Sequence, residues 1–199
     1  MEEASYESDP DDERVLWITV GGVPWRAVDA RLFRGRPPLP SLERGFENAF
    51  DELEARLACR FALKCLSRRA YFKRELAEEL KRRLVSKEGI EKALADCARL
   101  GYLDEEAHLQ AFLEGEKRRG SGPALILKKL TERGFSKEEA ERFLGGGLSE
   151  EELIRQMGAL VEKKMRGKAS LDVVKLRSLL TRKGYPHPLI RKFLSSFFS

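Results

Sequence analysis

The stretch "ILKKLTERGFSKEEAERFL", residues 126–144, has a counterpart fifty residues upstream and another fifty residues downstream. These counterparts are "LAEELKRRLVSKEGIEKAL" at 76–94 and "LRSLLTRKGYPHPLIRKFL" at 176–194. Six columns align without a gap: five apolar columns that start at Leu76, Leu80, Val85, Ile90 and Leu94, and one basic column of Arg83, Arg133 and Lys183. Self-similarity at a period of this length is the signature of a helical repeat array.

Each copy has room for three helices. In the first copy, apolar residues recur at steps of three or four residues from Phe46 to Phe61, which predicts an amphipathic helix ending near Leu66. Capping boxes open helices at Ser136 and Ser149, because serine and a glutamate three residues later satisfy each other's backbone amides. The predicted helices cover 46–66, 72–84 and 86–100 in the first copy, start at 104, 123 and 136 in the second, and cover 149–166, 171–182 and 188–197 in the third.

The first forty residues have a different pattern. Residues 15–20 and 23–28 are rich in β-branched and aromatic side chains and flank Gly21-Gly22, which predicts a β-hairpin with Pro24 on an edge strand. The expected fold class is all-α, with three tandem three-helix repeats forming an elongated curved body and a small N-terminal β-hairpin extension. The predicted divisions are an acidic arm with the hairpin and a Pro-rich linker at 1–40, and repeats at 41–103, 104–147 and 148–199.

Charge separates the chain into an acidic arm and a basic body. Residues 1–54 hold 6 Lys and Arg against 13 Asp and Glu, whereas residues 55–199 hold 32 against 20. Such a body favours an anionic partner, nucleic acid or an acidic protein surface. The longest uncharged apolar stretch, 15–25, is too short to span a membrane, and the acidic start is unlike a signal peptide. We therefore expect a cytoplasmic protein that does not contact a membrane.

The sequence contains no recognisable motif of a catalytic site or a metal site. Cys59, Cys65 and Cys97 form no C-x-x-C pair, and His108 and His187 have no partner acid or histidine at a readable spacing, so we expect no metal and no cofactor. The run 120–123, Gly-Ser-Gly-Pro, lacks the G-K-[ST] of a nucleotide loop. We interpret it as the end of one helix and the start of another, and we expect a protein that is not an enzyme.

Basic clusters are the candidate binding residues. Helix C-termini and solvated faces account for part of them, because cations are favoured there. Clusters nevertheless recur at 68–69, 117–119 and 163–168, once in each copy, and stacked repeats would place them in a row that matches a nucleic acid or a nucleoprotein filament. The full set is Arg68, Arg69, Lys73, Arg74, Lys81, Arg82, Arg83, Lys117, Arg118, Arg119, Lys128, Lys129, Arg133, Lys163, Lys164, Arg166 and Lys168.

Several of these residues also carry a family resemblance. The runs 101–106, 111–112, 118–120 and 122–123, with Ile126, Leu130 and Gly134, resemble the middle repeat of the RecX family, regulators of the RecA recombinase. Residues 62–69 with Glu75-Leu76 resemble that family's first repeat, and the likeness spans roughly 55–199. Glu114 and Glu116 depart from the family, which often has basic residues there.

The resemblance implies a non-enzymatic modulator, an inhibitor, that binds within the groove of the RecA filament on DNA and reduces its ATPase and strand-exchange activity. We expect the protein to be a monomer. It also implies DNA as a direct partner. One alternative is a free-standing DNA-binding regulator whose three-helix modules act as helix-turn-helix units. The candidate third helices, such as 136–144, offer no Asn or Gln for reading bases. A second alternative is a structural adaptor that holds an acidic protein.

Overall fold

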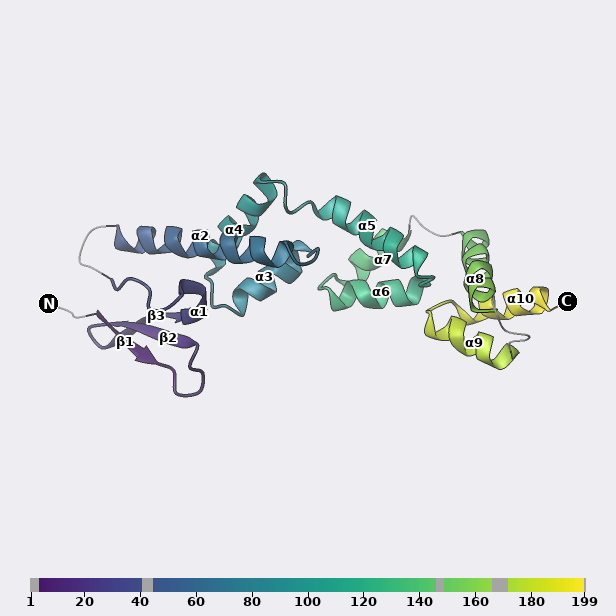
Figure 1. The fold of residues 1–199 in the computed structure, drawn as a ribbon, viewed down its shortest axis with the longest axis horizontal. Coiled ribbons are helices and arrows are strands. Elements are labelled where there is room, and N and C mark those ends of the chain that lie inside the picture. The colour runs from purple at the N-terminus through teal and green to yellow at the C-terminus, as the bar shows by residue number, and fades with distance from the viewer. Residues whose placement is uncertain (1–3, 41–44, 146–148, 166–171, 199) are drawn as a thin grey trace. The chain divides into compact units, whose positions relative to one another are not determined.

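The computed structural model describes residues 4–40, 45–145, 149–165 and 172–198. The described residues form a small antiparallel sheet followed by a series of helices (Figure 1). The chain divides into two compact units, Met1–His108 and Leu109–Ser199. Each unit is described by itself below. The predicted divisions at residues 40, 103 and 147 stay predictions.

The first unit begins with a three-stranded sheet in the order β1-β2-β3, formed by Ala4–Ser8, Val15–Val20 and Val23–Asp29. The predicted hairpin is confirmed: Gly21 and Gly22 take the left-handed conformation between β2 and β3, at φ of 59° and 77°. Strand β3 lies at the sheet edge, where the missing amide of Pro24 costs no central ladder bond. Strand β1 was not predicted, because its short sequence ASYES has little apolar alternation.

The sheet packs on the helical body through aromatic residues. Ile18 and Val28 are fully buried and form one cluster with Phe50 of α2, which spans Phe46–Leu66. The ring of Trp25 meets the ring of Phe50 edge-on, with 5.1 Å between centroids. A one-turn helix, α1 (Ala30–Phe33), follows β3 and is capped by the carboxylate of Asp29. The described N-terminal strands and α1 therefore form a folded module that packs on the first repeat.

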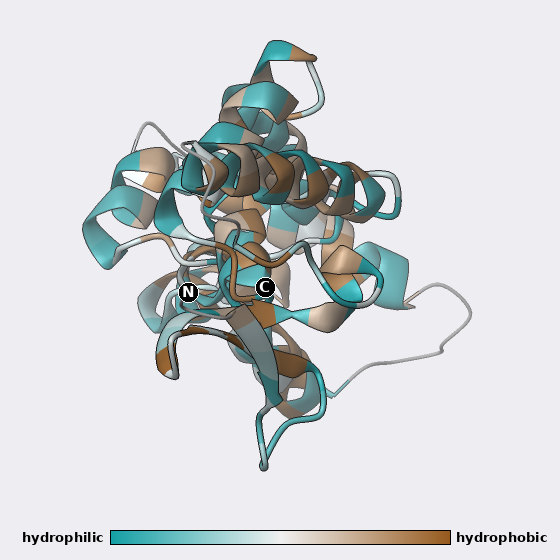
Figure 2. Ribbon diagram, turned by 90° about the vertical axis from the view of Figure 1, so that its left-hand side faces the viewer, coloured by the Kyte–Doolittle hydropathy of each residue, from teal (hydrophilic) through white to brown (hydrophobic). Residues whose placement is uncertain are grey.

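The first repeat consists of α2, α3 (Lys73–Lys81) and α4 (Lys87–Arg99). Its core is built from small residues of α2, which let the helices approach closely, and from apolar residues of α3 and α4. Ala58 and Ala62 are fully buried against Leu76, Leu80 and Ala93. Figure 2 shows how apolar and polar residues alternate along the helices, as an amphipathic pattern requires.

Two further sets of three helices follow. The second set is α5 (Glu105–Arg118), α6 (Pro123–Glu132) and α7 (Lys137–Gly145), and the third is α8 (Glu150–Met165), α9 (Val173–Arg182) and α10 (His187–Phe197). The predicted helix starts at Pro123, Ser136 and Ser149 agree with the structure to within one residue. In the third set, Met157, Leu176 and Leu180 are fully buried.

The turn between the second and third helix has the same backbone in all three repeats. The amides of Val85, Phe135 and Tyr185 each donate to the carbonyl five residues earlier, at 3.2–3.3 Å. The residue before each amide has a positive φ, which is 90° at Gly134, 83° at Gly184 and 57° at Leu84. This is the Schellman turn, in which glycine is favoured because it has no Cβ. The repeat is thus confirmed at backbone level, and Leu84 occupies a glycine position.

Candidate nucleic-acid and filament interface

The recurring cation clusters lie at the C-terminal end of the first helix of each repeat. Arg68 and Arg69 follow α2, Lys117 and Arg118 form the last turn of α5, and Lys163 and Lys164 lie in the last turn of α8. The negative end of the helix dipole favours cations at these positions. The three clusters therefore occupy equivalent places in the three repeats. Arg166 and Lys168 lie outside the described residues.

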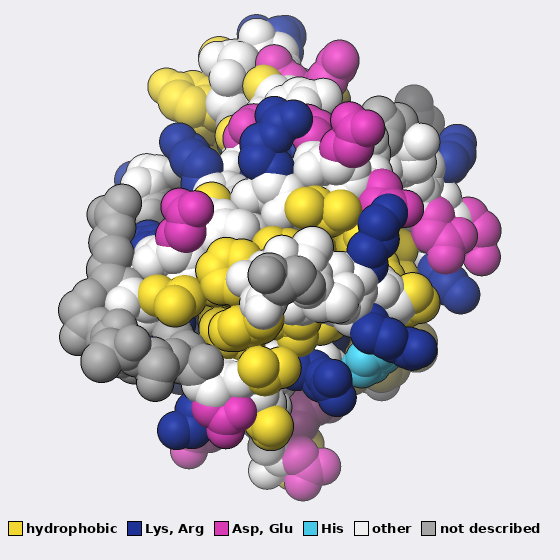
Figure 3. All heavy atoms as spheres, turned by 90° about the vertical axis from the view of Figure 1, so that its right-hand side faces the viewer, with side chains coloured by type: hydrophobic (Ala, Val, Ile, Leu, Met, Phe, Trp, Pro, Cys, Tyr) yellow, Lys and Arg dark blue, Asp and Glu magenta, His cyan; other side chains and the backbone are white. Residues whose placement is uncertain are grey.

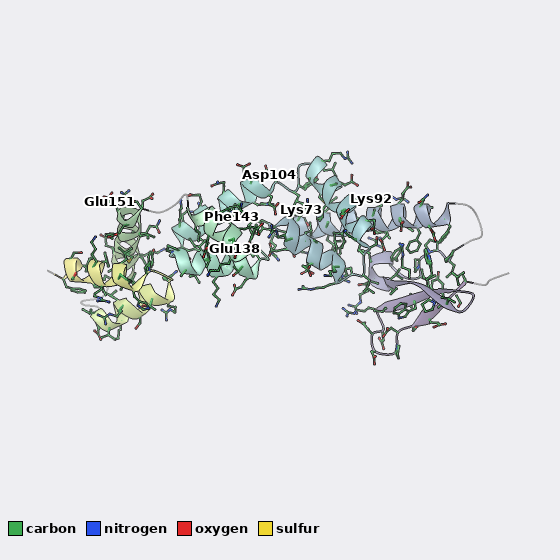
Figure 4. The ribbon with its side chains drawn as sticks, turned by 180° about the vertical axis from the view of Figure 1, so that it is seen from behind. Lys73, Lys92, Asp104, Glu138, Phe143 and Glu151 are labelled. Atoms are coloured by element: carbon green, nitrogen blue, oxygen red, sulfur yellow. The ribbon has the colours of Figure 1, made fainter. Side chains whose placement is uncertain are left out.

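Five of the predicted cations are available to an external anion. No acid within the described ranges pairs with Arg68, Lys73, Arg118, Lys163 or Lys164, and all five are exposed. Figure 4 marks Lys73 at the start of α3. Arg74, beside it, is exposed as well. A cation without a local partner gives up only hydration when it binds phosphate, so these side chains are the best-placed candidates.

Four more cations pair with an acid one helical turn away. These pairs are Lys81–Glu78 at 3.9 Å, Arg82–Glu79 at 3.0 Å, Lys117–Glu114 at 3.2 Å and Lys128–Glu132 at 3.7 Å. Exposed pairs of this kind contribute on the order of 0.5 kcal/mol or less, so a phosphate can displace the carboxylate. These cations remain candidates, although each brings an acid close to any bound anion.

Five predicted cations are held in intramolecular contacts. Arg83 reaches back to the buried carboxylate of Asp29 at 3.2 Å and lies over the ring of Phe61. The guanidinium of Arg69 lies 3.6 Å from the ring centroid of Tyr71 and contacts Glu75. The remaining three are Arg119, Lys129 and Arg133, of which the last lies over the ring of Phe112. For these side chains the contacts supply a structural role, and phosphate binding stays a prediction.

Glu116 is the centre of the most buried charge cluster in the second repeat. Its carboxylate is 2% exposed and accepts hydrogen bonds from Ser121 at 2.6 Å, Arg119 at 2.8 Å and Lys129 at 2.5 Å. Burial by itself raises the pKa of Glu116, but the bonds from Lys129, Ser121 and Arg119 outweigh it and bring the pKa down to about 2. The acid that stands where the family often has a cation therefore organises two of the predicted binding cations.

The Gly-Ser-Gly-Pro loop at 120–123 packs against the third repeat. The amide of Gly122 donates to the carbonyl of Lys183 at 2.7 Å, and the amide of Ala124 donates to that of Gly184 at 3.1 Å. A Cβ on Gly122 would lie 2.7 Å from the backbone of Gly184, so only glycine allows this approach. The Lys183 ammonium also donates to the carbonyl of Arg119 at 2.7 Å.

This packing leaves the loop without the free backbone amides that a phosphate-binding loop uses. A phosphate-binding loop needs backbone amides that point at the ligand. Here the amides of Gly120 and Ser121 close the end of α5 by donating to the carbonyls of Lys117 and Glu116. The amide of Gly122 is also engaged, and Pro123 has none. The loop is a joint between two repeats, as the sequence interpretation of a helix end followed by a helix start requires.

Sequence reasoning missed one group of cations. Arg56, Arg60 and Lys64 lie on α2 at a spacing of four residues, and Arg31 and Arg34 lie at α1. The spacing itself was a readable signal, since residues four apart share a helix face. Arg56, Arg60 and Lys64 are single cations and not consecutive basic pairs, and Arg31 and Arg34 lie in the part of the chain with a net negative charge.

Other kinds of site have little support in the part of the chain that the structure describes. No group of three or more His, Cys, Asp or Glu side chains is arranged to hold a metal ion there. No helix among those residues is long and apolar enough to cross a membrane.

Comparison with known proteins identifies the relatives. A regulatory protein RecX of Pseudomonas putida (strain GB-1) is 31% identical over 140 residues, which covers 68% of this chain and 88% of the relative. The chain belongs to the RecX family. A regulatory protein RecX of Pseudomonas syringae pv. tomato is 36% identical over 85 residues, and this match spans 55% of that RecX protein. No protein-family model matches the chain.

Solved RecX structures share the fold. The crystal structure of RecX from Lactobacillus salivarius matches with a TM-score of 0.58 at 16% identity, over 72% of this chain and 96% of that one. A second RecX crystal structure matches with the same TM-score and identity over 98% of this chain. At this identity the likeness establishes the fold alone. The family resemblance and the mostly helical fold with its N-terminal sheet are therefore confirmed, whereas the binding residues stay predictions.

Proposed function

We propose that this RecX-family chain modulates the RecA recombinase, as an inhibitor, by binding in the groove of the RecA filament on DNA. In this proposal it reduces RecA's ATPase and strand-exchange activity without chemistry of its own. It acts in the cytoplasm, in DNA repair, recombination and the SOS response. The observation that carries the proposal is the exposed, acid-free cation at the end of the first helix in every repeat. Arg68, Arg118 and Lys163 with Lys164 are these cations. Equivalent positions suit a partner whose anionic sites also repeat.

A filament has protein surface as well as phosphate, and the third repeat offers contacts for both. Figure 3 shows hydrophobic side chains gathered at the centre of the face seen from the C-terminal side, with Lys and Arg around them. Phe197 and Phe198, at the end of α10, are 37% and 49% exposed, and their rings meet edge-on at 5.4 Å. Exposed aromatic residues beside cations are typical of protein-binding surfaces.

The direct test is a titration of this protein against RecA on single-stranded DNA, with the rate of ATP hydrolysis as the readout. We expect the rate to fall as the protein approaches the RecA concentration. An unchanged rate across the titration contradicts inhibition, and a raised rate would make the protein a stabiliser of the filament.

Variants of the acid-free cations test the binding surface. We expect Arg68→Gln combined with Lys163→Gln and Lys164→Gln to need a higher concentration for half-inhibition and to make that concentration less dependent on salt. Arg69 is left intact because its contacts with Tyr71 and Glu75 are structural. If the variant inhibits as strongly as the parent protein at every salt concentration, these cations only terminate helices.

The helix-turn-helix alternative requires a third helix that can read base edges. The exposed side chains of α7 are two bases, two acids and one aromatic residue: Lys137, Arg142, Glu138, Glu141 and Phe143. Lys137 pairs with Glu141 at 3.8 Å. Acids on that face repel the phosphates on either side of a DNA groove. These side chains favour the filament proposal over independent, sequence-selective binding of duplex DNA.

A further inference from the structure

A cleft of about 200 Å³ lies between α1 and α2, inside the first unit. Its floor is apolar and formed by Leu32, Leu57 and Phe61. Its rim is formed by four cations, Arg31, Arg34, Arg60 and Lys64. Figure 1 shows the short α1 beside the long α2, so residues about thirty positions apart in sequence form one surface.

The cleft continues as a line of cations along α2. Arg56 precedes Arg60 and Lys64 at the same four-residue spacing, and Arg68 follows just beyond the helix end. Steps of four residues advance about 6 Å, so Arg56 and Lys64 are about 12 Å apart along the axis. We name Arg31, Arg34, Arg56, Arg60 and Lys64 the α1–α2 basic cleft.

The cleft cations have no internal acid to neutralise them. Within the described residues, none of the five side chains takes part in an ion pair or hydrogen bond, and all five are exposed. Acids near the cleft cations include Asp29, which accepts the backbone amide of Arg31 at 2.7 Å, and Glu52, one turn before Arg56 on α2. Asp12 also feels the charge of Arg31, although hydrogen bonds from Arg14 are the main cause that lowers its pKa to about 2. Five like charges held near an apolar floor repel one another, and a bound anion would relieve that repulsion.

The acids of the N-terminal module are engaged elsewhere. Asp12 pairs with Arg14, Asp9 accepts a hydrogen bond from the indole of Trp17, and Asp29 caps α1 and holds Arg83. No acid of residues 1–54 is among the described residues that line the cleft. Folding places Arg31 and Arg34 of the module in the same cleft as Arg60 and Lys64 of α2.

We propose that the α1–α2 basic cleft binds the phosphodiester backbone of a nucleic acid. This deepens the proposed function, on which it rests for its biological setting, by adding a contact that needs no RecA. The length of the cation line points to a polymer: about 12 Å of helix spans between three and four phosphates of one B-DNA strand at 3.4 Å each. A free nucleotide concentrates its charge in one short chain and cannot reach Arg56 and Lys64 together.

The test measures binding of the full chain to a fluorescein-labelled 30-nucleotide strand, and to the matching duplex, by anisotropy at several salt concentrations without RecA. The test variant is Arg56→Gln with Arg60→Gln and Lys64→Gln. We expect it to bind roughly tenfold more weakly or worse, and to lower the slope of log K against log salt by about two to three, since each lost phosphate contact removes about 0.7–0.9. Its melting temperature should match the parent's, because the three side chains are exposed.

The matched control removes three charges from another helix of the same unit. Lys87→Gln with Lys92→Gln and Arg99→Gln alters only exposed residues of α4, where Figure 4 marks Lys92. None of them lines the cleft. We expect this control to keep the parent's affinity and salt slope. If both triple variants weaken binding equally, general charge and not the cleft attracts DNA, and the proposal is wrong.

Competition separates the sources of negative charge. We expect unlabelled strand to displace the labelled one, while inorganic phosphate, a nucleoside triphosphate at equal phosphate concentration and polyglutamate at equal charge do not. Displacement by the triphosphate would make the cleft a nucleotide site, and displacement by polyglutamate would make it a site for acidic proteins; either overturns the proposal. Because RecA is absent, failure here leaves the ATPase titration untouched, and failure of that titration leaves this result standing.

Discussion

The buried carboxylate of Glu116 should be one of the largest single contributions to the stability of the second repeat. In the folded chain its pKa falls from 4.5 to about 2, as its hydrogen bonds to Lys129, Ser121 and Arg119 outweigh burial. A lowering of the pKa by this much corresponds to about 3 kcal/mol in favour of the charged form. The side chain is 2% exposed, so solvent screens it little. Glu116→Gln imitates the protonated acid, and we expect it to lower the free energy of unfolding by about 3 kcal/mol at pH 7.

The exposure of the two partner cations limits how large this loss of stability can be. Lys129 and Arg119 are 33% and 69% exposed, so both can recover hydration when the carboxylate is removed. The loss should therefore stay near the lower end of the 3–5 kcal/mol that follows the breaking of a buried ion pair. The control is Glu114→Gln, half a turn earlier on α5, whose pair with Lys117 is exposed. That change should cost about 0.5 kcal/mol or less.

The pH dependence gives a second, independent readout. A carboxylate whose pKa is depressed by folding stabilises the protein above its unfolded pKa, and this contribution disappears as pH falls through the folded pKa. The difference between the parent and Glu116→Gln should therefore shrink from about 3 kcal/mol at pH 7 to about half of that at pH 3. Urea unfolding followed by circular dichroism at both pH values measures it. A difference that is small at pH 7, or that does not change with pH, would refute the reasoning.

Three further substitutions test the backbone and the core by urea unfolding. Leu84→Gly should stabilise the protein by about 0.5–1 kcal/mol, because it relieves a left-handed leucine at φ 57°; a loss of stability would show that the leucine side chain matters more than its backbone. Gly122→Ala should lower the free energy of unfolding by about 2 kcal/mol, since its Cβ would lie 2.7 Å from Gly184. The control Gly115→Ala, whose nearest neighbouring atom is 4.0 Å away, should raise it by up to about 1 kcal/mol. Equal effects of the two changes would exclude the close contact as the cause. Tyr185→Phe should raise the free energy of unfolding by about 1 kcal/mol, because the buried hydroxyl has no hydrogen-bond partner among the described residues. A lower free energy of unfolding would show that the hydroxyl has a partner.

The secondary structure was largely predictable from local patterns. The helix starts at Pro123 and at the Ser136 capping box agree with the structure, since caps and prolines act through neighbouring backbone atoms. Strand β1 was not predictable, because its order comes from pairing with β2 and from the contact of Tyr6 with the cluster around Phe50. The helix α1 was missed as well, since one turn leaves no periodicity and depends on the cap from Asp29.

By itself, the sequence determined the three copies, the three helices in each copy and the family, because apolar spacing and turn chemistry act over a few residues and repeat every fifty. Only the tertiary structure decided which cations face solvent without an acid. Arg83 meets Asp29 across 54 residues, Lys129 meets Glu116 across 13, and α1 joins α2 to form the basic cleft. Whether a charge is neutralised depends on distances of a few ångström between such positions, and only the folded chain sets those distances.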